Sequence, residues 1–366
     1  MKIININLIS FKSAKSIGTF VYIKRILEQI SLMNSDDFFF YIYLRRGFDI
    51  TNLQLPSNSK IIYVPTLHLA IFRILFEQVF FYFYLKKADF FYAPCLSLPL
   101  FVNSYKILTI HDMVPFILKN KYGLFRKYFI PWMTKIAAHK ADLIVTVSYN
   151  SKEDIIRLLG IPPTKIKVIY NFILENEAVV SKVERRVSLE SYGLTCPFFL
   201  NVSTLQPGKN IERLIRAFKI FYDKTPSYQL CIVGNKGWGY EDIYKIVKEL
   251  NAERIIVFTG YLDDTILSQL YSACIGVVYV SLYEGFGIPP LEGFYHSKGA
   301  ICSNNSSLPE VVGDAAVLVD PMDDLSIAIG FSDFLEKREI LEANATKRVT
   351  VFNPKTITMK FLSLFK

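Results

Sequence analysis

The chain has 366 residues with a formal net charge of +9, and 51% of its residues are hydrophobic. That length suits two domains of ordinary size, and the apolar content is ample for two hydrophobic cores. Its five cysteines are scattered, odd in number and never in C-x-x-C spacing. This pattern argues against a disulfide framework or a zinc site and favours a reducing compartment, so we expect a cytoplasmic protein, either free or peripheral on the inner face of the membrane.

The positive charge belongs to the first half of the chain. Residues 1–180 hold 22 Lys and Arg against 12 Asp and Glu, a balance of +10, whereas residues 181–366 hold 20 against 21, a balance of −1. A basic half of this kind is a candidate to bind nucleic acid or an anionic membrane. No RNA- or DNA-binding signature accompanies it, so we expect no nucleic-acid partner and favour a membrane or an anionic substrate.

Two apolar stretches are not expected to be membrane segments. Residues 1–7 carry asparagines where a signal peptide needs an unbroken apolar core, and they indicate a first strand. Residues 69–85 are interrupted by Arg73, Glu77 and Gln78, which makes them too short and too polar for a transmembrane span. We expect a buried or surface-lying helix there.

In chain order, short apolar runs alternate with helix-length segments through the first half. The runs that indicate strands are residues 3–9, 38–44, 61–64, 90–93, 106–110, 143–147 and 166–169. The segments that indicate helices are residues 19–33, 69–86, 124–139 and 150–159. This alternation predicts a doubly wound α/β domain with a parallel sheet covered on both faces.

The alternation stops at residues 171–197, a stretch of mixed charge, and then begins again. Strands are expected at residues 198–202, 228–233, 255–258, 275–280, 300–303 and 315–319, and helices at 210–222, 241–250, 265–272, 325–336 and after Gly287. We therefore predict a first domain at 1–172, a linker at 173–197 and a second domain at 198–353. Residues 354–366 form an amphipathic segment that we expect to pack back on the first domain.

One stretch carries the most chemistry, the loop that follows the strand at 275–280. It contains Glu284, Gly285, Phe286, Gly287, Ile288 and Glu292. Strand, Gly-rich loop and helix N-terminus together make an anion site, because free N–H groups point outward and glycine allows close approach. Phosphate alone would not favour the two carboxylates, but the hydroxyls of a sugar would. The loop therefore predicts a ligand with both phosphates and hydroxyls, a nucleotide sugar.

A second candidate, Lys209, follows the strand at 198–202 and precedes a helix. A lysine in this position can reach a phosphate held at the helix N-terminus. Thr204 lies between this strand and Lys209, at the carboxyl end where ligands bind in doubly wound sheets.

Glu284 and Glu292 form a Glu-x7-Glu motif, with Gly-Phe-Gly directly after the first glutamate and Pro-Pro-Leu directly before the second. This motif resembles that of the retaining glycosyltransferases of family 4. The downstream run from Cys302 through Pro309-Glu310 to Asp314 is also similar to that family. The resemblance implies the GT-B fold, two Rossmann-like domains that face each other across a cleft. It implies retaining transfer of a mannose-like or other hexose from a GDP- or UDP-sugar to a hydroxyl of a glycan or lipid-linked acceptor, in polysaccharide, lipopolysaccharide or capsule synthesis.

The resemblance also implies roles for single residues. His111 matches the His of the His-Asp pair in mannosyltransferase-like members, where it lies against the donor sugar and supports the developing positive ring. Lys209 matches the lysine at the diphosphate, and Glu284 the carboxylate on the donor sugar. With them, the residues expected to bind the donor are Gly18, Thr204, Gly285, Phe286, Gly287, Ile288 and Glu292, the last on the ribose diol.

The chain departs from the family's pattern in two places. An arginine usually accompanies the lysine at the diphosphate, but the positions that supply it hold Thr204 and Gly208. The glycine-rich turn after the first strand keeps only Gly18. No D-x-D occurs in the sequence, so we expect no metal cofactor, with Lys209 and helix N-termini neutralising the phosphates instead.

Two other functions stay open at this point, a nucleotide-sugar epimerase of the same fold and an inactive nucleotide-sugar-binding subunit of a glycan-assembly complex.

A further expectation concerns the basic segment at residues 119–140, where lysines and arginines are interleaved with aromatic and aliphatic residues. Such a helix suits the headgroup layer of an anionic membrane, although a solvated basic face would have the same composition.

Overall fold

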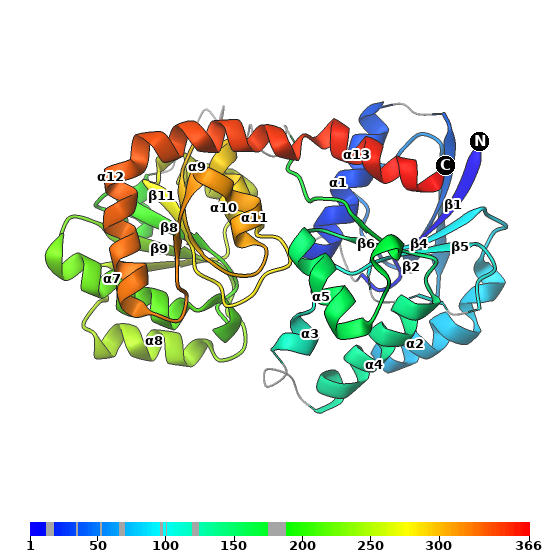
Figure 1. Ribbon diagram of the computed structural model, residues 1–366, viewed down its shortest axis with the longest axis horizontal. Coiled ribbons are helices and arrows are strands. Elements are labelled where there is room, and N and C mark those ends of the chain that lie inside the picture. Colours follow the sequence, from blue (N-terminus) through cyan, green and yellow to red (C-terminus); the bar gives the residue numbers. More distant parts are fainter. Residues whose placement is uncertain are drawn as a thin grey trace. The chain divides into compact units, whose positions relative to one another are not determined.

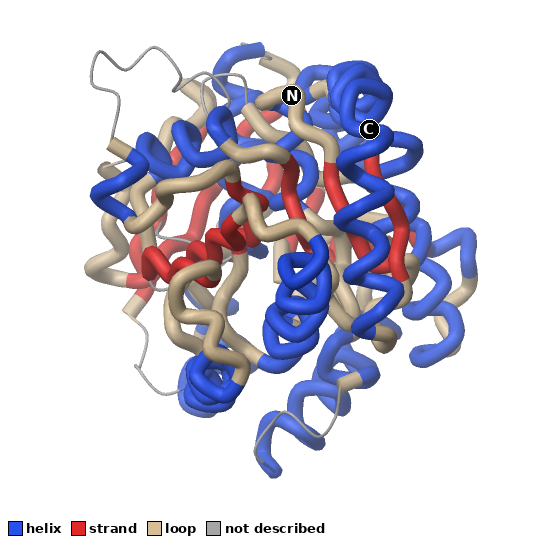
Figure 2. The backbone as a smooth tube through the Cα atoms, turned by 90° about the vertical axis from the view of Figure 1, so that its left-hand side faces the viewer, coloured by secondary structure: helices blue, strands red, loops and turns tan. Residues whose placement is uncertain are grey.

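The structure is a computed structural model that describes residues 1–11, 18–33, 36–51, 53–65, 70–95, 98–99, 101–118, 124–174 and 188–366 (Figure 1). The chain forms two compact units. Unit 1 comprises Met1–Phe172 with Asn353–Lys366, and unit 2 comprises Ile173–Phe352. Each unit consists of a sheet of parallel strands with helices packed against it, so the predicted class of two doubly wound α/β domains is confirmed (Figure 2).

Unit 1 contains a seven-stranded sheet in the order β3-β2-β1-β4-β5-β6-β7, and all neighbours run parallel. The strands are β1 (Lys2–Asn7), β2 (Phe38–Arg45), β3 (Ser59–Val64), β4 (Phe90–Ala93), β5 (Tyr105–Thr109), β6 (Leu143–Thr146) and β7 (Ile166–Val168). The helices between them are α1 (Gly18–Met33), α2 (Ala70–Val79), η1 (Phe81–Tyr84), α3 (Val114–Ile117), α4 (Leu124–Lys140), α5 (Tyr149–Leu159) and η3 (Pro163–Lys165).

The last residues of the chain complete unit 1. They form α13 (Pro354–Leu362) and η9 (Ser363–Phe365), and α13 packs beside α1. The ring of Phe361 lies 5.1 Å from that of Tyr92, and the ring of Phe365 lies 5.4 Å from that of Phe90. These edge-on aromatic contacts bury the apolar face of an amphipathic segment against strand β4.

Unit 2 contains a six-stranded parallel sheet in the order β10-β9-β8-β11-β12-β13. The strands are β8 (Phe198–Val202), β9 (Gln229–Val233), β10 (Ile256–Gly260), β11 (Gly276–Tyr279), β12 (Ala300–Ser303) and β13 (Ala316–Val319). The helices are η5 (Leu189–Tyr192), η6 (Pro207–Lys209), α7 (Ile211–Lys224), α8 (Tyr240–Glu249), α9 (Asp264–Ala273), α10 (Ile288–Tyr295), α11 (Leu308–Val312), η7 (Gly313–Ala315), α12 (Asp324–Arg348) and η8 (Val349–Phe352).

Strand order places a topological switch point in each sheet. In unit 2 the chain leaves β8 toward β9 on one side, and β11 is its neighbour on the other. In unit 1 the same relation holds for β1, with β2 on one side and β4 on the other. Ligands of open α/β sheets bind outside the carboxyl ends of the strands at such points. The loops after β8 and β11 are therefore where a site in unit 2 is expected.

Several elements differ from the expected ones. The helix expected at 325–336 continues to Arg348, because Leu341 and Ala345 are buried on its inner side and Arg338 pairs with Glu342 one turn on at 2.8 Å. The helix expected at 69–86 is two pieces, α2 and η1. Of the expected linker, residues 175–187 lie outside the described residues, and Thr195 and Cys196 are bound through their amides to the Gln229 side chain of unit 2.

Among the residues that the structure describes, no helix is both long enough and apolar enough to cross a membrane.

Candidate active site

Lys209 lies at the end of η6, in the loop that joins β8 to α7. Asn210 follows it with a φ of 59°, a left-handed conformation that turns the chain sharply into α7. The Asn210 amide holds this turn in place, since Nδ2 donates to the carbonyls of Val280 at 3.0 Å and Pro321 at 2.7 Å. Lys209 is thus fixed beside the end of strand β11, across the switch point of the sheet.

Glu284 lies in the loop from β11 to α10, and the segment after β12 holds this loop. The amide of Glu284 donates to Oγ of Ser306 at 3.1 Å. The hydroxyl of Ser307 contacts the carbonyls of Glu284 at 3.0 Å and Phe286 at 2.8 Å. Gly287 completes the turn with a φ of 111°, and a Cβ there would come within 2.6 Å of Leu308. The positive φ therefore favours glycine at 287, and a side chain there would also force the buried Leu308 to shift.

Lys209 and Glu284 meet directly. Nζ of Lys209 lies 2.6 Å from Oε1 of Glu284. The hydroxyl of Tyr279, on the last residue of β11, accepts from Lys209 Nζ at 3.0 Å and donates to Glu284 Oε1 at 2.9 Å. The sequence predicted that the two charged residues share a site, and the structure adds the tyrosine that joins them.

The charges of this group follow from its surroundings. Burial by itself would lower the pKa of Lys209, but the Glu284 carboxylate and the Tyr279 hydroxyl outweigh burial and raise that pKa well above its usual range. Burial raises the pKa of Tyr279, with Glu284 acting in the same direction. Lys209 is therefore a permanent cation and Tyr279 a neutral hydroxyl at physiological pH, and both side chains of the ion pair keep partial access to solvent.

Within the described part of the chain, the positions that would supply the family's arginine beside Lys209 hold no cation. Thr204 is exposed just after β8. Arg213 is in the first turn of α7, but its Nε lies 2.9 Å from Oδ1 of Asp324, so this guanidinium is engaged on the side of α12. Lys209 is the cation that the described structure holds against Glu284.

Glu292 lies on α10, where Tyr271 of α9 positions it. The Tyr271 hydroxyl donates to Oε2 of Glu292 at 2.7 Å. Burial raises the pKa of Tyr271, and the nearby Glu292 carboxylate raises it further, so the hydroxyl keeps its proton. The Tyr271 ring in turn stacks on His296, with ring centres 5.6 Å apart. The partly buried carboxylate is thus oriented before any ligand arrives.

The other residues predicted to bind the donor have more varied surroundings. Phe286 is buried with its ring 5.5 Å from that of Phe352, so its side chain anchors the loop. Gly285 is buried in the loop, and Ile288 is the first, half-buried residue of α10. Gly18 is exposed at the start of α1, and an added Cβ would meet nothing within 4 Å. Packing within the protein does not require glycine at 18, so its predicted role at a ligand stays a prediction.

His111 belongs to unit 1 and follows β5, next to the strand that borders the switch point. Its Nε2 lies 2.9 Å from the carbonyl oxygen of Pro94, just after β4. A carbonyl can only accept, so Nε2 carries the proton and Nδ1 of the neutral ring is the lone-pair nitrogen. The ring of Tyr22 contacts His111 edge-on at 5.1 Å. Burial lowers the pKa of His111 to about 4, which keeps the imidazole neutral at pH 7.

Sequence reasoning missed the side chains that hold the charged residues in place. They are Tyr271, Tyr279, Ser306 and Ser307. Tyr279 could have been noticed, because it is the polar end of an otherwise aliphatic strand and the glycine-rich loop follows closely. The two serines give no such signal, since the contact depends on the pairing of β11 with β12.

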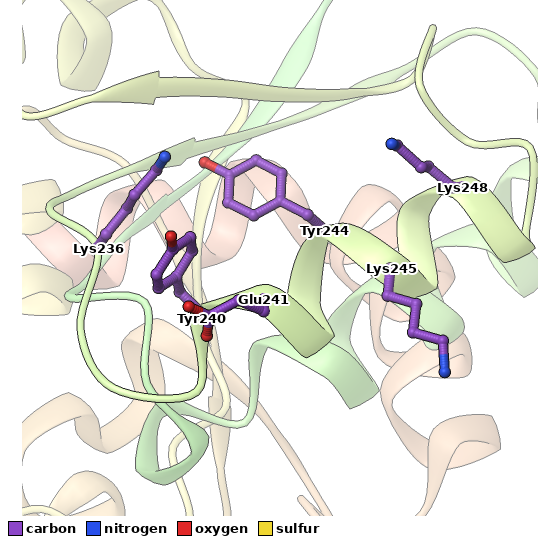
Figure 3. Close-up of a pocket in the computed structure, with 6 residues that line it drawn as sticks. All are labelled: Lys236, Tyr240, Glu241, Tyr244, Lys245 and Lys248. Atoms are coloured by element: carbon purple, nitrogen blue, oxygen red, sulfur yellow. The ribbon is translucent and has the colours of Figure 1, made fainter.

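A separate pocket of about 490 Å³ lies along α8 (Figure 3). It is lined by Lys236, Tyr240, Glu241, Tyr244, Lys245 and Lys248. The Lys236 ammonium lies over the rings of Tyr240 and Tyr244, 4.9 and 5.6 Å from their centres. None of the predicted site residues lines it, and Lys236 offers a lysine of the same unit to compare with Lys209.

Two family models match the chain. The model of glycosyl transferases group 1 matches residues 191–349, which contain Lys209, Glu284 and Glu292. The model of glycosyltransferase family 4 matches residues 36–175, which contain His111.

Curated relatives and solved structures agree with these matches. The O-antigen chain mannosyltransferase B of Escherichia coli is 31% identical over 269 residues, which cover 71% of this chain and 70% of that protein. The serotype-specific mannosyltransferase WbdA of Escherichia coli is 32% identical over 222 residues, 58% of this chain but only 27% of that longer protein.

The fold matches that of sucrose-phosphate synthase from Thermosynechococcus elongatus, with a TM-score of 0.77, 19% identity and coverage of 100% of this chain and 98% of that one. It also matches Anabaena HepE in complex with UDP-glucose, with a TM-score of 0.74, 18% identity and coverage of 100% and 99%.

Proposed function

The chain belongs to the group 1 and family 4 glycosyltransferases and has their GT-B fold, and from this we propose that it transfers a mannose-like hexose, with retention, from a nucleoside diphosphate sugar to a glycan or lipid-linked hydroxyl. The observation that carries the proposal is the contact of Lys209 with Glu284 at the switch point of unit 2. A cation for phosphate and a carboxylate for hydroxyls, 2.6 Å apart, match the two halves of such a donor.

Each half of the donor has a residue suited to it. Lys209 would stabilise the negative charge that develops on the leaving diphosphate, a type of stabilisation that is often the largest single contribution to catalysis. Glu284, released from Lys209 as the phosphates take its place, would accept hydrogen bonds from the sugar hydroxyls. Glu292, held by Tyr271, would accept from the ribose diol.

His111 is suited to the developing positive charge on the sugar because it is itself neutral. Its lowered pKa of about 4 leaves the ring uncharged at pH 7, so it would not repel an oxocarbenium-like ring. With Nε2–H committed to Pro94, the lone pair of Nδ1 is the side of the ring that a cationic centre would favour. No carboxylate nucleophile is needed in this scheme, in which the leaving phosphate takes the acceptor proton.

The relative named O-antigen chain mannosyltransferase B supports a mannosyl donor and a surface-polysaccharide product. The HepE structure is described with UDP-glucose, so the base and the sugar of the donor are both open to test.

We keep membrane docking through residues 119–140 within the proposal. Residues 119–123 lie outside the described residues, and on α4 the side chains of Tyr128, Trp132 and Lys135 are exposed.

The test is a thermal-shift screen against nucleoside diphosphates and their sugars. A ligand at about 100 times its Kd adds roughly 2.7 kcal/mol to the free energy of unfolding, which is readily seen as a shift in Tm. The ligand that shifts Tm is then supplied in labelled form without acceptor. Conversion of the sugar to an epimer would establish the epimerase alternative, and binding without turnover on any lipid-linked acceptor would establish the inactive subunit.

A further inference from the structure

A continuous stretch of unit 1 exposes large apolar side chains to solvent. Residues 72–83, in α2 and η1, include six such side chains. Leu75, Val79, Phe80 and Tyr82 are each more than half exposed, and Phe83 is 79% exposed. Scattered exposed apolar residues are ordinary, but six in twelve residues form a patch of the kind that marks a binding surface. We call this set the α2–η1 surface; its members are Phe72, Leu75, Val79, Phe80, Tyr82 and Phe83.

Helix α2 has the reverse of the polarity expected for a helix in water. Glu77 faces inward with its side chain fully buried, and neither of its carboxyl oxygens has a hydrogen-bond partner among the described residues. Its ionic neighbour is the half-buried Arg73, whose Nε lies 3.4 Å away. Meanwhile Phe72, Leu75 and Val79, at spacings of three and four, are on the outside. A surface helix normally buries the apolar stripe and exposes the charges, so this helix is suited to an apolar medium outside.

Positive charge accompanies the apolar surface. Lys86 and Lys87 are exposed directly after η1. Helix α4 covers the same face of the seven-stranded sheet, because Phe76, Phe81 and Ala137 join one core cluster beneath both segments (Figure 1). The exposed side of α4 adds Tyr128, Trp132 and Lys135. Aromatic rings and lysines around an apolar centre are the pattern of a protein face that rests in the lipid headgroup layer.

The charge of the whole unit distinguishes a bilayer from a second copy of the chain. Unit 1 holds 25 Lys and Arg against 10 Asp and Glu, a balance of +15, whereas unit 2 holds 17 against 23, a balance of −6. Two copies joined through the α2–η1 surface would bring like charges together, which opposes association. An anionic bilayer offers both the apolar medium and the opposite charge.

We propose that the α2–η1 surface inserts shallowly into an anionic lipid bilayer and is the main membrane-docking element of unit 1, with α4 alongside it. The inference rests on the proposed function only in that a lipid-linked acceptor would lie at such a bilayer. It shifts the principal contact away from the basic segment at 119–140. The apolar residues supply the anchoring and the lysines supply the preference for anionic lipid.

The first experiment measures co-sedimentation with vesicles of phosphatidylcholine containing about a third phosphatidylglycerol. The variant L75S/F83S removes two exposed apolar side chains, and the matched control L325S/I340S removes two from unit 2, where Leu325 and Ile340 are 58% and 66% exposed. We expect L75S/F83S to lower the partition coefficient at least tenfold and the control to leave it within twofold. Equal Tm values for the proteins confirm that folding is unchanged.

The second experiment uses the two tryptophans of the chain, one in each unit. In the single-tryptophan variant W238F, brominated phosphatidylglycerol should quench the fluorescence of Trp132, whereas in W132F it should leave Trp238 unquenched. These measurements need no turnover, so their outcome is separate from that of the transferase proposal. Unchanged vesicle binding of L75S/F83S, equal quenching of both tryptophans, or a dimer in lipid-free solution that L75S/F83S dissociates would each overturn the inference.

Discussion

Two basic side chains follow strands near the switch points of the two sheets, Lys209 in unit 2 and His111 in unit 1, and burial affects both in the same direction. Burial disfavours the charged form of each. Lys209 keeps its charge because the Glu284 carboxylate is 2.6 Å away. His111 loses its charge because burial outweighs its one hydrogen bond, to the uncharged carbonyl of Pro94, which favours the protonated ring but does not offset burial. The partner, and not the depth of burial, determines which of the two is a cation.

This comparison predicts that unit 2 supplies the cation that stabilises the diphosphate. The largest loss of activity is therefore expected when Lys209 is removed. K209A should lower kcat/KM by about 100- to 1000-fold, because the loss of one electrostatic contact to developing charge typically lowers the rate by that factor. The matched control is K236A, which removes a lysine of the same unit that lies over two tyrosine rings and lines the pocket along α8. The control should stay within about threefold of wild type. Activity of K209A within threefold would show that the phosphate is neutralised elsewhere.

Removal of each of the two carboxylates, Glu284 and Glu292, should affect the binding of a different ligand. E292A removes the acceptor proposed for the ribose diol and should weaken binding of a bare nucleoside diphosphate by about 10- to 100-fold, the size of one or two charge-assisted hydrogen bonds. E284A should leave that binding unchanged or tighter, since it frees Lys209, and should weaken only the intact donor. Isothermal titration with both ligands measures the difference. Equal losses for both ligands in both variants would refute the division of roles.

The neutral state of His111 predicts a pH dependence of stability. The folded pKa of about 4 lies below the ordinary value of 6.5, so the unfolded chain binds the proton first as pH falls. The contribution of the neutral ring is complete above pH 6.5 and is lost between pH 6.5 and about 4. With allowance for partial exposure of the ring, the loss should be roughly 2 kcal/mol.

The measurement compares wild type with H111Q by chemical denaturation across this range. Glu77, whose pKa burial raises to about 7, contributes with the opposite sign, losing stability as pH rises toward 7. Its contribution is common to both proteins and cancels in the difference. A wild-type curve that stays parallel to that of H111Q would mean that the imidazole has the same pKa in the folded and unfolded chains, contrary to the comparison with Lys209.

The smallest expected effect is that of Y279F, which tests whether the tyrosine positions the pair or takes part in the reaction. Phenylalanine keeps the buried ring and leaves the direct contact of Lys209 with Glu284, but it removes the hydroxyl that touches both. We expect kcat/KM to fall by about 3- to 10-fold, the value of one ordinary hydrogen bond. A fall beyond 100-fold, with binding of the donor unchanged, would place the hydroxyl at the reacting atoms.

The parallel sheets and the positions of the charged residues could be predicted from the sequence because they depend on local patterns. Short apolar runs and the glycine loop after residue 280 indicate where strands end, and ligands of such sheets meet strand ends. The sequence also predicted Lys209 at a phosphate, but not that it would pair directly with Glu284.

What could not be predicted depends on contacts between distant segments. Ser306 and Ser307 reach the Glu284 loop only because β12 lies beside β11. The inverted polarity of α2 could not be predicted either. In a helix that is apolar on more than one side, the periodicity of the sequence does not show which side is buried. The buried Glu77 and exposed Leu75 reverse the usual assignment.

The central claim is that the chain transfers a hexose with retention, and product analysis tests it most directly. A nucleoside diphosphate hexose labelled at the anomeric carbon is incubated with a lipid-linked saccharide acceptor, and the product is examined by NMR. The account predicts an axial glycosidic bond from an axial donor bond, with one nucleoside diphosphate released for each sugar transferred. An inverted anomeric centre, or loss of the donor without a glycosylated acceptor, would contradict it.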